Sequence, residues 1–216
     1  MRLLDKKPLI IAIIIMIATQ MGTNFYLVAL PSVAEYFRQP SSLVLNTVYY
    51  YLIPYGLFQL FIAPFVNSIG FKRTAMWGFF TFALGAVIIL CAGNIFTFAL
   101  GRIVQGIGGS SVYLMTKMII QRKYKEGQVN IAFSILESFA MATPGIAPLL
   151  GACILQFFPW QGLFYFILIY VAFATFMVSR MLDNKEIQKP PRLTKILSNY
   201  KELILNFNYL RFLCVI

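Results

Sequence analysis

Six long runs of apolar residues divide the chain, and short polar or basic stretches separate them. A helix that crosses the hydrocarbon core of a bilayer, about 30 Å thick, needs roughly twenty apolar residues, and each run has about that length. The pattern therefore predicts an all-α membrane protein with six transmembrane helices. We place them at residues 8–30, 43–66, 75–93, 96–119, 129–155 and 161–181.

The chain becomes polar after the sixth run. Residues 183–206 contain Pro190 and Pro191, followed by an amphipathic stretch, which predicts a cytoplasmic linker with a surface helix; a plain solvated spacer fits equally well. Residues 207–216 are apolar again but too few to span a bilayer, and we interpret them as the start of a truncated seventh helix. On this division, residues 1–182 form the six-helix transmembrane bundle.

Composition and charge support the membrane interpretation. The chain is 60% hydrophobic and only 12% charged, whereas a soluble domain has about 25% charged residues. Fourteen lysines and arginines lie in the loops on one side of the predicted helices, and only Arg38 lies on the other. The positive-inside rule then predicts a multi-pass protein of the plasma (inner) membrane with a cytoplasmic N-terminus. The net charge of +11 is scattered rather than gathered in a patch, which argues against a nucleic-acid partner.

The side chains that most enzymes and metal sites need are scarce. The sequence contains no histidine, its three cysteines lack metal-ligand spacing, and its carboxylates are not clustered. Catalytic triads and histidine-based metal sites are therefore excluded. We expect neither an enzyme nor a protein with a metal or cofactor.

The loop between the second and third predicted helices carries a recognisable pattern. Residues 63–73 resemble the G-x-L-a-D-r-x-G-r-k loop of the major facilitator superfamily. Gly70 and Lys72 match this motif, whereas Asn67 replaces its aspartate and Ala63 its first glycine. Glycine suits the tight turn expected there.

The fourth and fifth predicted helices carry two further motifs. Arg102, Gly106 and the glycines after them resemble the superfamily's R-x-x-q-G-x-g-a motif. Pro148 and Gly151 match its antiporter motif, g-x-x-x-G-P-x-x-G-G. With Asn24–Pro31, which is similar to D-x-Y-L-P-A-L-P, they resemble the drug:proton antiporters of the Bcr/CflA and MdfA types.

This resemblance covers the whole chain but only half of the family's usual twelve helices. It implies the N-terminal half of a major-facilitator fold, ending at the start of a seventh helix. The implied function is secondary active transport, namely multidrug or small amphipathic compound efflux by proton antiport with alternating access. The implied partners are an amphipathic or cationic drug, protons, the lipid bilayer and a C-terminal six-helix half. Asn24 stands where the group commonly has a coupling aspartate, and the first predicted helix contains no carboxylate that could take its place.

An arginine inside an apolar helix is costly and needs a partner. Arg102 lies about 9 Å from the external end of its helix and Gln20 about 18 Å from the cytoplasmic end of the first helix, which places them at similar height. We therefore expect Arg102 to face Gln20, Thr23 and Asn24. Two roles stay open, a structural clamp and a cavity charge. The predicted substrate-binding residues are Gln20, Asn24, Tyr51, Tyr55, Arg102 and Gln105.

Glu137 is the only carboxylate well inside a predicted helix. Burial favours the neutral form of a carboxylate, which suits a proton carrier, and this makes Glu137 the candidate for proton coupling. An ion pair with Lys117 or another basic residue is the alternative.

Other functions fit the sequence less well or need a different assembly. The chain could be a truncated, non-transporting fragment, or a half-transporter that needs a partner half. A membrane enzyme lacks a nucleophile with a base, and a channel lacks a charged ring or a filter-like sequence.

Overall fold

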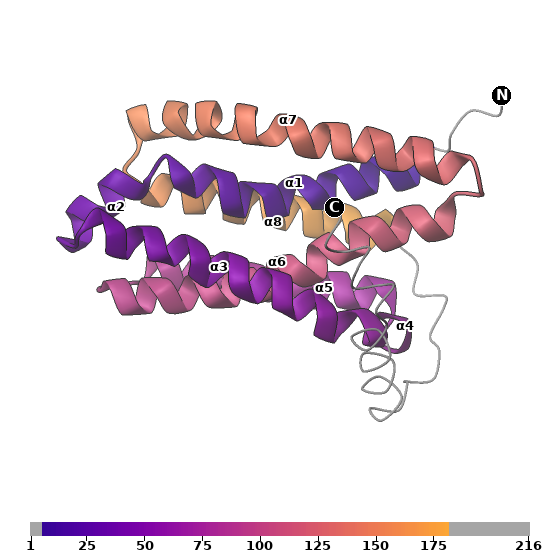
Figure 1. Ribbon diagram of the computed structural model, residues 1–216, viewed down its shortest axis with the longest axis horizontal. Helices are drawn as coiled ribbons and strands as arrows, with labels where there is room; N and C mark the ends of the chain where they lie inside the picture. The colour runs from indigo at the N-terminus through magenta and orange to yellow at the C-terminus, as the bar shows by residue number, and fades with distance from the viewer. Residues whose placement is uncertain (1–5, 182–216) are drawn as a thin grey trace, which may run out of the picture.

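The computed structural model describes residues 6–181, and these residues form helices without any strand. The long helices lie side by side in an elongated bundle (Figure 1). The linker expected at 183–206 and the seventh-helix segment expected at 207–216 lie outside the described residues. The elements are α1 (Lys6–Leu27), α2 (Leu30–Phe37), α3 (Ser41–Ile62), η1 (Ala63–Phe65), α4 (Val66–Ile69), α5 (Phe71–Leu90), α6 (Ile95–Lys123), α7 (Gln128–Phe157) and α8 (Gln161–Met181).

The six long helices, α1, α3, α5, α6, α7 and α8, correspond to the six predicted spans, with ends that differ by a few residues. The first span was predicted to continue to residue 30, which is wrong, because α1 ends at Leu27. Pro31 lies in the first turn of the separate helix α2. Proline lacks a backbone N–H and clashes with a preceding helical turn, so it starts a new helix instead of extending the old one.

Five of these helices, α1, α5, α6, α7 and α8, are long and apolar enough to cross a membrane. The sixth, α3, has 22 residues, the same length as α1. At 1.5 Å per residue it is about 33 Å long, which matches a bilayer core. Its four tyrosines and its polar residues Asn46 and Gln59 leave it just outside that set of five, although it carries no charged residue. The fold is therefore a multi-pass helical bundle of six long helices.

Helix α6 lies at the centre of the bundle and packs against α5, α3 and α1. Glycines allow this close approach. A Cβ atom on Gly108 would lie 2.2 Å from the backbone nitrogen of Phe82 in α5, and one on Gly106 would lie 2.4 Å from the carbonyl oxygen of Tyr51 in α3. Because bilayer lipid is as apolar as leucine, such backbone-to-backbone packing is a main source of helix association in membranes.

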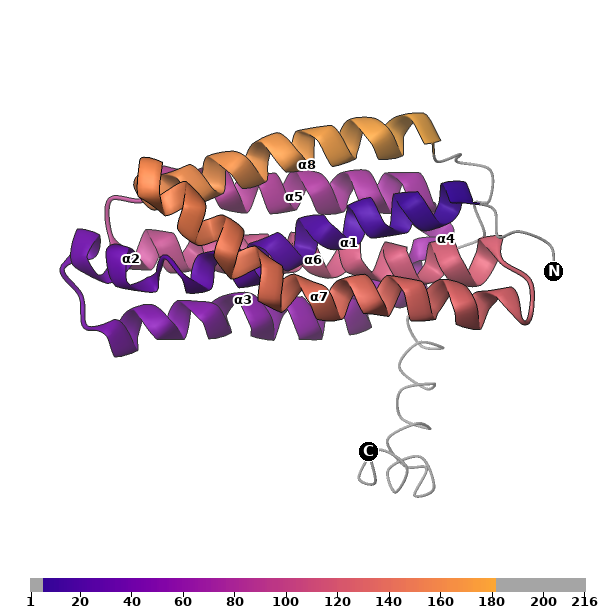
Figure 2. The ribbon, with the colours of Figure 1, turned by 90° about the horizontal axis from the view of Figure 1, so that it is seen from above.

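Helix α7 lies at the edge of the bundle and crosses over it at an angle (Figure 2). The main helix that it contacts is α1. Only four of its thirty residues are buried: Ala132, Leu136, Ala147 and Gly151. The helix continues through Pro144 and Pro148. Its outward face is left uncovered by the rest of the described chain.

The turns between the helices have clear local causes. Asn94 caps α6, where its side-chain oxygen accepts a hydrogen bond from the Thr97 N–H at 2.9 Å. Gly70 before α5 and Gly127 before α7 have φ of 92° and 84°, a region that favours glycine. The turn expected at Gly70 is therefore present. The predicted connections near Gly93 and at residues 157–160 are also confirmed.

Candidate functional site

Arg102 is the largest fully buried side chain of the described bundle, at 0% exposure. It projects from α6 toward α1. One terminal nitrogen, Nη1, donates to the carbonyl oxygen of Gly22 at 2.8 Å and to Oε1 of Gln105, one turn further along α6, at 2.7 Å. Gln105 is also fully buried. Arg102 therefore joins α6 to α1 inside the bundle.

Two tyrosine rings complete the immediate surroundings of Arg102. The guanidinium carbon lies 4.5 Å from the ring centre of Tyr26 in α1 and 4.5 Å from that of Tyr51 in α3. Cation–π contacts of this kind contribute about 2 kcal/mol when the groups are desolvated. The Tyr51 hydroxyl donates to the Thr19 carbonyl at 3.2 Å, and the Tyr26 hydroxyl is hydrogen-bonded to Thr47. Both rings are thus fixed by their own hydrogen bonds.

Arg102 has no carboxylate partner among the described residues. Their acidic members are Glu35, Glu126 and Glu137, and Glu137 pairs with Lys117 instead. Nε and Nη2 of Arg102 and Nε2 of Gln105 are buried without a hydrogen-bond partner in the described part of the chain. Unpaired buried donors cost free energy. The arrangement is therefore unfavourable as a purely structural clamp.

The predicted contact between Arg102 and α1 is present, but the predicted partners are wrong. The contacts come from Gly22 and Tyr26, which are four residues apart and share one side of α1. Gln20 instead reaches α7, where its Nε2 donates to the Ala140 carbonyl at 3.3 Å. Asn24, four residues after Gln20, is 9% exposed and makes no hydrogen bond with a described residue. Arg102 does lie at the height of this part of α1, whereas the rotation of α1 about its axis determines which residues it contacts.

Three tyrosines connect the surroundings of Arg102 to the other end of α6. Tyr51 stacks on Tyr55 with ring centres 5.6 Å apart, and Tyr55 lies 5.9 Å from Tyr113 of α6. Tyr51 is fully buried, whereas Tyr55 and Tyr113 are partly buried. Of this group only Tyr55 and Tyr113 reach the surface of the described bundle, whereas Tyr51, Arg102 and Gln105 are enclosed.

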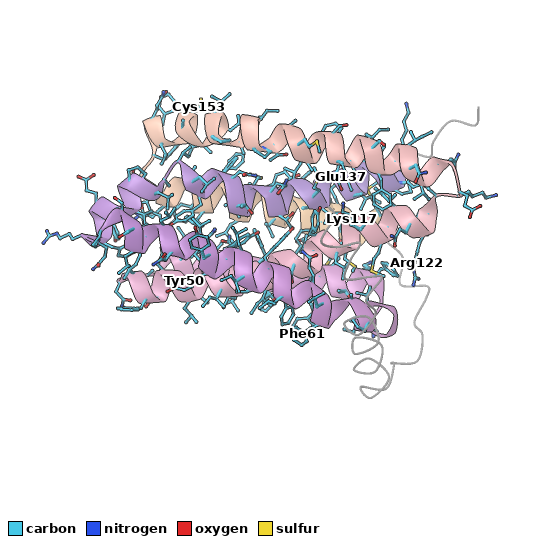
Figure 3. The ribbon with its side chains drawn as sticks, in the orientation of Figure 1. Tyr50, Phe61, Lys117, Arg122, Glu137 and Cys153 are labelled. Atoms are coloured by element: carbon cyan, nitrogen blue, oxygen red, sulfur yellow. The ribbon has the colours of Figure 1, made fainter. Side chains whose placement is uncertain are left out.

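The chain of side-chain contacts that begins at Arg102 ends in an ion pair between Lys117 of α6 and Glu137 of α7. The ammonium group of Lys117 lies 5.4 Å from the ring centre of Tyr113 and pairs with the carboxylate of Glu137. Figure 3 shows Lys117 on α6 and Glu137 on α7, on the sides where the two helices face each other. Both side chains stay partly exposed, at 31% and 38%. The alternative raised for Glu137, pairing with Lys117, is thus the observed arrangement.

The remaining motif residues have packing positions. Lys72 joins α5 to α8, because its ammonium group donates to the Ser179 carbonyl at 2.6 Å. Gly151 faces Val28, the residue directly after α1, whose side chain would lie 2.8 Å from an added Cβ. Pro148 lies within α7. Asn67 lies in α4, and its side chain is outside the described part of the structure.

With this geometry established, comparison with known proteins identifies the family. The model of the Major Facilitator Superfamily matches residues 12–215, and the chain belongs to that superfamily. It is 24% identical over 202 residues to multidrug resistance protein D of Escherichia coli (strain K12), covering 93% of this chain and 51% of that protein. It is 25% identical over 182 residues to a bicyclomycin resistance protein homolog of Haemophilus influenzae, covering 83% of this chain and 46% of that protein.

A solved structure agrees on the fold. The crystal structure of a peptide transporter, POT, in complex with sulfate superposes with a TM-score of 0.68 at 13% identity, covering 97% of this chain and 46% of that one. At this identity the likeness concerns the fold alone. The chain spans about half the length of the relatives that it matches.

Proposed function

We propose that this chain is the N-terminal half of a secondary active transporter that exports amphipathic or cationic compounds by proton antiport. The observation that carries the proposal is Arg102, a buried cation with unpaired donors and no carboxylate nearby among the described residues. An apolar bundle needs no such residue for its stability, and ionisable side chains inside transmembrane helices characteristically lie along substrate or ion pathways. The multidrug and bicyclomycin resistance names of the relatives support the substrate class.

The proposed pathway follows the side chains between the two charged positions of α6. Arg102 and Lys117 are fifteen residues apart, about 22 Å along the helix. Tyr51, Tyr55 and Tyr113 connect them through successive ring contacts. In this proposal Gln20, Asn24 and Tyr55 contact the substrate, and Arg102 responds to its arrival through Tyr51. Glu137 carries the coupling proton, since protonation would release Lys117 and loosen α7 from α6.

A second six-helix half is part of the proposal, because the outward face of α7 has no partner in the described chain. Major-facilitator transporters bind substrate between two halves that rock about a site near the middle of the bilayer. That half is a C-terminal six-helix bundle or a second copy of this chain. If neither binds, the chain is a non-transporting fragment, which is the competing function.

Orientation is the simplest part of the proposal to test. The distribution of basic residues favours a cytoplasmic N-terminus and a cytoplasmic linker. Reporter fusions after Arg38 and Pro159 are then expected to be external, and fusions after Lys72 and Lys189 cytoplasmic. One reversed pair of neighbouring fusions would contradict the six-helix topology.

Transport itself is tested by reconstituting the purified chain in liposomes with an imposed proton gradient and a fluorescent cationic dye. We expect no gradient-dependent dye movement by a demonstrated monomer, and movement once a second six-helix half is supplied. Glu137→Gln is expected to abolish the dependence on the gradient, and Glu126→Gln, in the loop before α7, is the matched control. Dye movement by the monomer would contradict the need for a second half. Failure in every pairing would favour the fragment.

A further inference from the structure

A shallow groove of about 420 Å³ lies on the surface of the bundle along the first part of α5 (Phe71–Leu90). It is lined by Lys72, Arg73, Met76, Trp77 and Phe80. Trp77 and Phe80 are 64% and 61% exposed, and the same groove contains the two cations Lys72 and Arg73. None of these residues contributes to the proposed transport pathway, so the groove is a feature separate from that pathway.

The cations of this groove differ in how firmly they are held. Lys72 is fixed by its hydrogen bond to the Ser179 carbonyl of α8. Arg73 is exposed and makes no hydrogen bond, ion pair or ring contact with another described residue. Its guanidinium is therefore available to an external anion. Arginine matches the geometry of a phosphate group with two parallel hydrogen bonds.

Neighbouring helices bring more positive charge to the same end of the bundle. Arg180 follows Ser179 in the last turn of α8, which packs against α5. Arg122 of α6 lies over the ring of Phe71 at 4.2 Å, and Figure 3 shows it at this end. The described carboxylates Glu35, Glu126 and Glu137 form no ion pair with Arg73 or Arg180. Among the described residues, this end of α5 therefore carries a surplus of positive charge that favours an anion.

The groove changes from charged to apolar along the helix axis. Arg73, Trp77 and Phe80 recur at helical spacing on one side of α5, and seven residues separate the first from the last, about 10 Å. A cation at headgroup height, tryptophan at the interface and phenylalanine deeper match the layers of a bilayer leaflet. A soluble phosphate compound would leave the apolar part of the groove, Met76, Trp77 and Phe80, uncovered.

We propose that this groove binds an anionic phospholipid, with its phosphate at Arg73 and Lys72 and an acyl chain along Met76, Trp77 and Phe80. Basic pockets at the cytoplasmic side of transmembrane helices recognise such headgroups electrostatically. The proposal concerns a lipid site and does not depend on which compound is transported. It depends on the proposed orientation only for the leaflet that supplies the lipid.

The fluorescence of Trp77 can report whether lipid occupies the groove, because Trp77 is one of its lining residues. The chain has two tryptophans, and the other, Trp160, is 3% exposed among aromatic side chains at the opposite end of the bundle. The chain is reconstituted in phosphatidylcholine vesicles with a minor fraction of phosphatidylglycerol, and bromine, a fluorescence quencher, is placed on the acyl chains of one lipid or the other. The Trp77→Phe variant measures the contribution of Trp160, which is subtracted.

We expect brominated phosphatidylglycerol to quench Trp77 about fivefold more than its share of the lipid predicts, since one cation near the surface favours an anionic lipid by about that factor. Arg73→Gln is expected to reduce this preference to the bulk share. Lys125→Gln, which removes an exposed cation outside the groove, is the matched control and is expected to keep it. Because Arg73 holds no other described residue, its loss should leave the fold intact, and near-native quenching by brominated phosphatidylcholine verifies this.

Three results would overturn the proposal. The first is quenching by brominated phosphatidylglycerol in proportion to its share in the native chain. The second is an equal effect of Arg73→Gln and Lys125→Gln, which would indicate unspecific attraction to the basic end. The third is loss of the preference on addition of inorganic phosphate or glycerol phosphate at constant ionic strength, which would assign the cations to a soluble anion.

Discussion

Helices α5 and α7 both lie at the edge of the bundle, yet their outward faces differ in residue type (Figures 1 and 2). The exposed face of α5 is bulky and apolar: Trp77, Phe80, Leu84 and Val87. Helix α7 also exposes large apolar side chains, such as Ile131, Met141 and Leu149, but it carries a strip of small or polar residues opposite its contact with α1: Ser134, Ser138, Gly145, Ala152 and Gln156. Large apolar side chains are stable against lipid, whereas small and polar ones are typical of helix interfaces and water-filled paths in membranes.

The inward faces of the two helices differ as well. An added Cβ on Gly85 of α5 would lie 2.4 Å from the backbone nitrogen of Gln105, whereas one on Gly151 of α7 would lie 2.8 Å from a side-chain atom of Val28 and 3.5 Å from the nearest backbone atom, the carbonyl oxygen of Phe25. Helix α5 is thus packed tightly into the bundle on one side and suited to lipid on the other. Helix α7 is packed more loosely, with only four buried residues. This difference agrees with the proposal that α7 meets a second half, whereas α5 belongs to the tightly packed part of the bundle.

The largest expected effect comes from adding one methyl group to each helix. Gly85→Ala forces α5 and α6 apart at backbone atoms next to Arg102, and we expect the unfolding free energy to fall by about 2–3 kcal/mol. Gly145→Ala meets no atom and replaces a poor helix former, so we expect no loss or a gain of up to about 1 kcal/mol. Unfolding in mixed micelles at increasing dodecyl sulfate measures both. Equal losses in the two variants would remove the distinction between the helices.

A smaller effect on stability is expected on the side of α6 that faces α1 and α3, where Arg102 lies. Arg102→Met keeps much of the side-chain volume against Tyr26 and Tyr51 and removes the unpaired donors, so we expect the unfolding free energy to change by less than about 1 kcal/mol. Dye binding by the assembled transporter should weaken about tenfold, or about 1.4 kcal/mol. Arg102→Lys should not restore it, because lysine lacks the planar fork.

Stability and binding together decide the role of Arg102. A loss of several kcal/mol in Arg102→Met, with dye binding preserved in the fraction that folds, would identify a structural clamp. Normal stability with normal dye binding would remove Arg102 from the site altogether. Unfolding in micelles and fluorescence titration with the dye give the two readouts.

The smallest expected effect concerns the attachment of α7 to α6. Glu137→Gln removes the ion pair with Lys117, and because both side chains are partly exposed we expect a loss of at most about 1 kcal/mol. Amide hydrogen exchange in α7, compared at one pH, should therefore be faster in Glu137→Gln than in the native chain. Glu126→Gln should exchange like the native chain. An unchanged exchange rate in Glu137→Gln would exclude the ion pair as an attachment of α7 to α6.

The sequence is enough to predict where each long helix lies along the chain, but not how each helix is rotated about its own axis. Helix lengths follow from the bilayer thickness, and Gly70 and Asn94 signal turns by their own chemistry, so six spans and their connections could be predicted. The height of Arg102 against α1 follows from the rise per residue. Which side of α1 faces α6 depends on packing against several helices at once, and for this reason Gly22 and Tyr26 were missed as partners.

Two further differences have the same origin. Tyr51 and Tyr55 are four residues apart on α3, yet one is fully buried under Arg102 and the other reaches the surface. Tyrosines at positions 49–51 occupy all sides of that helix, so no periodic pattern selects the inward one. Pro31 by itself predicts a break before α2, but the residues on both sides of it are apolar, and for this reason the first span was predicted to continue.

Photocrosslinking tests the central claim, that α7 meets a second half and α5 meets lipid, most directly. A benzophenone amino acid replaces Met141 on α7 or Phe80 on α5, which are 81% and 61% exposed, in the membrane-embedded and assembled protein. After illumination, the account predicts adducts to a second polypeptide, or to a second copy of this chain, from position 141. It predicts adducts to lipid from position 80. Lipid adducts alone from position 141, or the same protein adducts from both positions, would contradict it.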